Sequence, residues 1–81
     1  MANMYNEIIA NAIRVGDILA DLNELAKKDG FGAGVAIAKE AIRVELSTQI
    51  LVLDRLVHMM PQEKAKRWAA VRVYLFAVMF K

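Results

Sequence analysis

The chain has 81 residues, of which 58% are hydrophobic, and its 11 basic and 9 acidic residues leave a formal net charge of +2. This composition excludes an intrinsically disordered chain, which would need low hydrophobicity or a high net charge. With no cysteine and a single histidine, the chain cannot form a disulfide or a thiolate metal site, and no metal or cofactor is expected.

The hydrophobic runs are too short for an ordinary transmembrane helix, which needs about 20 largely apolar residues. The longest uncharged runs are residues 30–38, 46–53 and 73–80. The first twelve residues carry Glu7 as their only charge and lack the basic and then apolar order of a secretory signal. We therefore expect a cytoplasmic protein that forms a single domain over residues 1–81.

Apolar residues at helical spacing predict a first helix over residues 3–28. Lys27 and Lys28 stand at its end, where cations interact favourably with the helix dipole, and Gly30 follows as a residue that can leave the helical conformation. The segment therefore has both the pattern and the ending of an amphipathic helix.

A second helix is predicted over residues 34–60, and it carries two apolar stripes. The larger stripe faces the predicted core. Ile37, Val44 and Leu51 recur every seven residues near the opposite side, where a helix serving one core would carry polar groups. This spacing indicates a second packing surface, although β-branched residues on a merely exposed face are the alternative.

Pro61 predicts a break after residue 60 and a third helix over residues 62–80, because proline suits a first turn and keeps the preceding residue out of helical backbone. Residues 68–80 carry Arg72 as their only charge, and a helix that is apolar nearly all round is a buried one. The β-rich string 71–76 could instead form a strand, but its only pairing partner would be a copy of itself.

The predicted fold class is therefore all-α: an antiparallel hairpin of two long helices plus a third C-terminal helix. We expect homo-oligomerisation, as a homodimer or a higher assembly, to complete it, because the apolar surface exceeds what one small core can cover. The residues expected at the partner or oligomer interface are Ile37, Val44, Leu51, Trp68, Arg72, Leu75 and Met79.

Two polar residues, Glu45 and Gln49, fall inside the apolar arc of the second helix on a helical wheel, with Arg14 and Lys39 as possible charge partners. A buried carboxylate must be paired or protonated, so the pair is either a polar lock or a ligand contact. We favour a buried polar lock of Arg14, Glu45 and Gln49 that sets the helix register.

Two patterns invite a catalytic or cofactor-binding interpretation. The glycine-rich residues 30–34 precede a helix with Lys39, but no strand or Gly-Lys-Ser/Thr sequence accompanies them, and a tight turn with Phe31 plugging the bundle is favoured. His58 follows Asp54 by four residues, but no nucleophile accompanies them. We therefore expect no catalytic or cofactor-binding residue and no enzymatic activity.

The last third of the chain is basic, because residues 61–81 carry five basic residues and one acidic residue. Such a segment could contact nucleic acid, an anionic membrane surface or an acidic protein face. Its basic residues do not share one helical face, and no DNA-reading motif appears. The alternative is that the segment rests against the acidic side chains Asp17, Asp21 and Glu24.

These features predict a small non-enzymatic helical module that binds itself and a larger protein by surface occupation. Small size, the lack of a catalytic motif and surplus apolar surface resemble the short proteins of phages and mobile elements that inhibit or modulate host proteins. Two alternatives are a nucleic-acid-associated regulator that uses residues 64–72 and a peripheral membrane protein that inserts residues 68–80.

Overall fold

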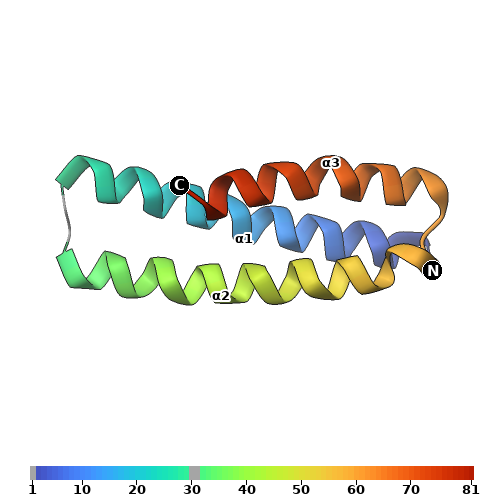
Figure 1. Ribbon diagram of the computed structural model, residues 1–81, viewed down its shortest axis with the longest axis horizontal. Coiled ribbons are helices and arrows are strands. Elements are labelled where there is room, and N and C mark those ends of the chain that lie inside the picture. The colour runs from blue at the N-terminus through green and yellow to red at the C-terminus, as the bar shows by residue number, and fades with distance from the viewer. Residues whose placement is uncertain (1, 30–31) are drawn as a thin grey trace.

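The computed structural model describes residues 2–29 and 32–81, which fold into three α-helices and one short 3-10 turn (Figure 1). Their bounds are α1, Ala2–Asp29; α2, Gly32–Leu56; η1, Val57–Met59; and α3, Gln62–Met79. No strand occurs among these described residues. The predicted all-α class is therefore confirmed, and the string 71–76 is helical.

The helices run along the long axis of a rod with extents of 43 × 18 × 17 Å. α1 and α2 run in opposite directions, and α3 turns back to run parallel to α1 (Figure 1). α3 is shorter than the other two helices and ends partway along them. At one end of the rod, α1 and α2 therefore lie without a third helix from the described residues.

α3 begins at a break that proline imposes. Met60 has extended backbone, with φ −80° and ψ 147°, as the residue before a proline should. The carbonyl of Pro61 accepts the backbone N–H groups of Lys64 and Ala65, both at 3.0 Å, and Glu63 places a negative charge in the first turn. Both features stabilise the N-terminus of a helix.

The connection between α2 and α3 differs from the continuous helix expected up to residue 60. The α-helix ends at Leu56, and the chain tightens into the 3-10 turn η1. The hydroxyl of Tyr5, near the start of α1, donates a hydrogen bond to the carbonyl of Met59 at 3.2 Å. α1 thus satisfies a backbone carbonyl that the end of a helix leaves free.

The core lies where the three helices meet, and each helix contributes to it. The large side chains that are fully buried are Ile9, Leu19, Leu46, Leu53, Trp68 and Leu75. α1 approaches α3 closely at Gly16, where an added Cβ would lie 2.5 Å from Cδ2 of Leu75. A side chain added at this position would therefore have to displace Leu75.

The structure corrects the expected role of Trp68, Leu75 and Met79. These residues were predicted at a partner or oligomer interface, but they are buried in the core. The opposite side of α3 is the exposed one, where Val73 retains 71% of its accessible surface. A helical wheel shows which residues share a face, but not which of two apolar faces turns inward.

Gly16→Ala and Gly34→Ala form a matched pair that tests the close approach of α1 and α3. Nothing lies within 4 Å of a Cβ added at Gly34, in contrast to position 16. Overpacking a core costs about 1–3 kcal/mol, whereas alanine gains roughly 1 kcal/mol of helix propensity over glycine. In denaturant titrations, Gly34→Ala should raise the free energy of unfolding above that of the parent chain. The free energy of unfolding of Gly16→Ala should be about 1–3 kcal/mol lower than that of Gly34→Ala. Equal effects would show that the two helices do not meet closely at Gly16.

Candidate functional site

An apolar surface runs along the side of α2 that faces away from the core. Ile37, Val44 and Leu51 retain 70%, 58% and 53% of their accessible surface. The exposed Ala41 and Thr48 lie between them, so the residues alternate at four- and three-residue spacing, as in a helix–helix seam. These five residues are called the α2 outer face below.

The polar groups on and beside the α2 outer face have partners within α2 itself. Thr48 donates its hydroxyl to the carbonyl of Val44 at 3.1 Å. At the margins, Arg43 pairs with Glu40 at 2.6 Å and Gln49 donates to Glu45 at 3.0 Å. Covering the face would therefore bury apolar surface without stranding Thr48 or the Arg43–Glu40 pair, whereas Oε1 of Gln49 is already buried without a donor among the described residues.

A second cluster joins α2 to α3 through the carboxylate of Asp54. Its Oδ1 accepts a hydrogen bond from Nε1 of the buried Trp68 at 2.9 Å. Nε of Arg72 donates to both carboxylate oxygens, at 3.0 and 3.1 Å. Arg72, predicted at the interface, is thus exposed but already paired.

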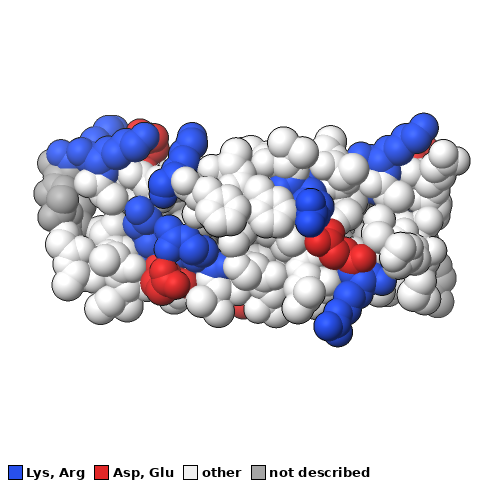
Figure 2. Space-filling view, viewed as in Figure 1, with Lys and Arg blue, Asp and Glu red and all other residues white. Residues whose placement is uncertain are grey.

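Aromatic rings extend this cluster along α3. The guanidinium of Arg72 lies 4.7 Å from the centroid of the Phe76 ring, and the Phe76 and Phe80 rings stack with centroids 6.0 Å apart. Figure 2 shows the side of α2 and α3 facing the viewer as mostly neutral surface, with charged side chains in separate groups. The cluster therefore presents an aromatic surface, and Asp54 neutralises the positive charge of Arg72.

Two of the basic residues of α3, Arg67 and Arg72, reach different helices. Nη1 of Arg67 donates to Oδ1 of Asn6 in α1 at 3.4 Å, whereas Arg72 reaches Asp54 in α2. The acidic side of α1 is instead contacted by Tyr74, whose hydroxyl donates to Oδ1 of Asp17 at 2.6 Å. Arg72 therefore does not rest against the acidic residues of α1.

The predicted buried lock of Arg14, Glu45 and Gln49 is wrong in this structure. Glu45 is exposed and bonds Gln49 on its own helix, and Arg14 is exposed and donates to Oδ1 of Asn11 at 3.0 Å. The reason is that α2 is apolar on two sides. The buried arc is centred on Leu46, Ile50 and Leu53 rather than on the direction that includes Glu45.

The patterns considered for catalysis do not form a site among the described residues. Gly30 and Phe31 lie outside those residues, so the predicted plug is not described. His58 is exposed in η1, and the carboxylate of Asp54 is occupied by α3. In residues 2–29 and 32–81, no group of three potential His, Asp or Glu ligands gathers to hold a metal ion, and no helix is long and apolar enough to cross a membrane.

Comparison of the chain with family models, with curated proteins and with solved structures found no match. The surfaces described above are what the chain offers to a partner. Of these, the α2 outer face is an extended apolar strip on a regular helix.

Tyr74 provides a pH-dependent test of the contact between α1 and α3. The hydrogen bond to Asp17, together with burial and the negative charges of Asp17 and Asp21, raises the pKa of Tyr74 from 10.0 to about 12. Because the folded state favours the protonated phenol, this stabilisation is fully present below pH 10.0 and is lost as the pH rises through about 12. In a Tyr5→Phe background, absorbance titration should show this high pKa, and Asp17→Asn should lower it. If Tyr74 has a pKa near 10.0 while Asp17 is present, the contact between these two residues would be contradicted.

Asp54→Ala and Asp54→Asn separate the two roles of this carboxylate. Alanine leaves the buried Nε1 of Trp68 without its acceptor, which should lower the free energy of unfolding by about 1–3 kcal/mol. Asparagine keeps an acceptor for the indole and loses only the charge that pairs with Arg72, so its loss should be smaller. Thermal or urea unfolding measures both, and a larger loss for asparagine than for alanine would contradict this assignment.

Proposed function

We propose that this chain is a small, non-enzymatic protein-binding module that covers the surface of a larger protein and also self-associates. The observation that carries the proposal is the α2 outer face, where Ile37, Val44 and Leu51 remain more than half exposed. These side chains add little to the monomer's core. Their burial would stabilise only a complex, which is how contiguous exposed apolar surface usually functions.

The geometry of the α2 outer face suits a partner helix laid along it. A second copy offers the same face and could form a twofold-symmetric contact. In a parallel pair, Glu40 would lie across from Glu45 of the partner subunit, because these residues flank the strip at the positions that meet between parallel helices. An antiparallel pair avoids this repulsion, so we expect the antiparallel arrangement.

The energies limit how strong such self-association can be. Fully burying an aliphatic side chain of this size contributes about 1.5–3 kcal/mol, and Ile37, Val44 and Leu51 are already partly covered. Bringing two molecules together costs an estimated 4–15 kcal/mol. Three such side chains from each copy offset that cost only at the lower end of its range, so we expect weak self-association with a Kd no tighter than roughly 10 µM.

The proposed mode of action toward a larger protein is steric. A rod of 43 Å with an apolar strip along one helix can fill a groove as an amphipathic helix does. It would then block that groove without any chemical step. This is the mode of action of the short phage and mobile-element proteins that the sequence resembles in style.

Val44→Lys tests self-association at the centre of the α2 outer face. The substitution puts a charge where the contact should be driest, and it should cost little in the monomer because Val44 is more than half exposed. Light scattering at about 100 µM, roughly tenfold above that Kd, should give a mass close to that of a dimer for the parent chain and a monomer mass for the variant.

Val73→Lys is the matched control, because it makes the same change at an exposed valine of α3. It should leave the dimer mass unchanged. A monomeric parent at the same concentration, or equal dissociation by both variants, would contradict self-association through the α2 outer face.

A further inference from the structure

The far end of the rod, where α3 is missing, is a second surface with its own chemistry. The end of α3 lies level with Asn23 of α1 and Arg43 of α2, because both side chains bond its last carbonyls. The residues of α1 after Asn23 and those of α2 before Arg43 therefore extend past α3 (Figure 1). This part is called the open end. On α2 it covers about three helical turns.

Two side chains fix the level at which α3 stops. Nδ2 of Asn23 donates to the carbonyl of Val78 at 3.2 Å, and Nε of Arg43 donates to the carbonyl of Met79 at 3.2 Å. The last carbonyls of a helix lack intrahelical donors, so these bonds act as caps supplied by α1 and α2. The space beyond them is thereby defined by the fold.

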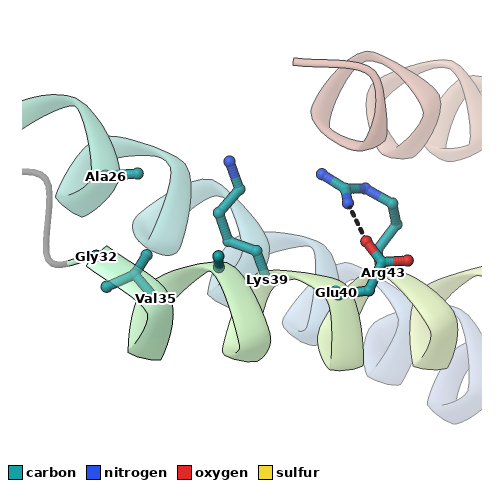
Figure 3. Close-up of a pocket in the computed structure, with 7 residues that line it drawn as sticks. Ala26, Gly32, Val35, Lys39, Glu40 and Arg43 are labelled. Atoms are coloured by element: carbon teal, nitrogen blue, oxygen red, sulfur yellow. Dashed lines mark hydrogen bonds and ion pairs between the residues drawn. The ribbon is translucent and has the colours of Figure 1, made fainter.

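That space is a shallow cavity with a small apolar floor and walls that carry Lys39 and the Arg43–Glu40 pair. A hollow of about 450 Å³ is lined by Ala26, Gly32, Val35, Ala36, Lys39, Glu40 and Arg43. Figure 3 shows Lys39 rising from α2 toward the space beside α3, while Arg43 is turned to Glu40. A smaller hollow of about 170 Å³ shares two of these residues and is lined by Asn23, Ala26, Lys27, Lys39 and Lys81.

Two kinds of polar group at the open end have no partner among the described residues: a buried hydrogen-bond acceptor and two lysine side chains. Asn23 is only 5% exposed, and its Oδ1 is buried with no hydrogen-bond donor. Burying such an acceptor without a donor is unfavourable. Lys27 pairs with Glu24 at 3.7 Å, but neither Lys39 nor Lys81 has a described carboxylate within 4.0 Å. The smaller hollow therefore brings a buried acceptor together with Lys27, Lys39 and Lys81.

The ligand that complements this set must bring N–H donors and negative charge together. The first turn of an α-helix does so, because its first four N–H groups lack intrahelical partners and acidic side chains are favoured there. The small side chains of Ala26 and Ala36 allow a helix backbone to approach the floor. Asn23, Lys39 and Lys81 line the same smaller hollow, so the end of a helix placed there would lie beside all three.

We propose that the open end binds a short amphipathic helix of a partner protein, with an acidic first turn placed against the end of α3. The helix takes the third position of the bundle beyond the end of α3, beside the described residues of α1 and α2. Its first-turn N–H groups reach Oδ1 of Asn23, and its carboxylates pair with Lys39 and Lys81. The proposal rests on the proposed function as a protein-binding module, but it uses a surface separate from the α2 outer face.

A pair of synthetic peptides tests the proposal directly. Both are acetylated, fluorescently labelled, about twelve residues long and identical in composition, with leucine and alanine along one face. One carries three glutamates in its first helical turn and the other carries them in its last turn. In anisotropy titrations of the full chain, the first peptide should bind about tenfold more tightly than the second. Only the first peptide has its carboxylates at the same end as its free N–H groups and the positive end of its helix dipole.

Variants of the chain locate the binding. Lys39→Gln should weaken binding of the first peptide about fivefold, the effect of losing a partly buried ion pair. Lys66→Gln removes an exposed cation of α3 outside the cavity and should leave the affinity unchanged. Equal affinity for the two peptides, no binding of either, or equal weakening by both variants would overturn the proposal.

The side-chain amide of Asn23 gives a second readout that does not depend on total affinity. Its ¹⁵N–¹H signals should shift when the first peptide is added, because Oδ1 gains a donor. Binding without this shift would also overturn the proposal. The Val44→Lys variant should bind the peptide as tightly as the parent chain does. Loss of self-association can therefore be distinguished from loss of peptide binding at the open end.

Discussion

The position of α3 depends on the carboxylate of Asp54, which receives the indole N–H of the buried Trp68 and the guanidinium of Arg72. Burying tryptophan stabilises a small core strongly, but its N–H must find an acceptor. Asp54 supplies that acceptor from α2 and pairs with Arg72 as well. This one group therefore ties the inward-facing side of α3 to α2.

Once α3 is oriented in this way, the rest of its packing follows. Leu75 is pressed against Gly16 of α1, and Tyr74 comes within hydrogen-bond distance of Asp17. At the far end, Asn23 and Arg43 bond the last carbonyls of α3. Side chains of both long helices thus fix the rotation of α3 and the level at which it stops.

The same arrangement leaves two surfaces unpartnered, and they differ in chemistry. The α2 outer face is apolar, and its polar neighbours are paired within the helix, so it suits hydrophobic contact with another helix. The open end combines a shallow cavity with lysines and a buried acceptor. It therefore suits a ligand that brings negative charge and N–H donors at the same end. A short chain can present both because its third helix covers only part of the other two.

The sequence by itself determined the helices, because the 3.6-residue period of apolar residues and the break at Pro61 are local properties. It also predicted that Ile37, Val44 and Leu51 lie outside the core, and these side chains are exposed. It could not decide which apolar side of α2 or α3 turns inward, because a helical wheel has no absolute orientation. The buried lock at Glu45 and the interface role of Trp68, Leu75 and Met79 failed for that reason. Only the tertiary structure decided these orientations, since they depend on contacts between residues far apart in the chain, such as Asp54 with Trp68.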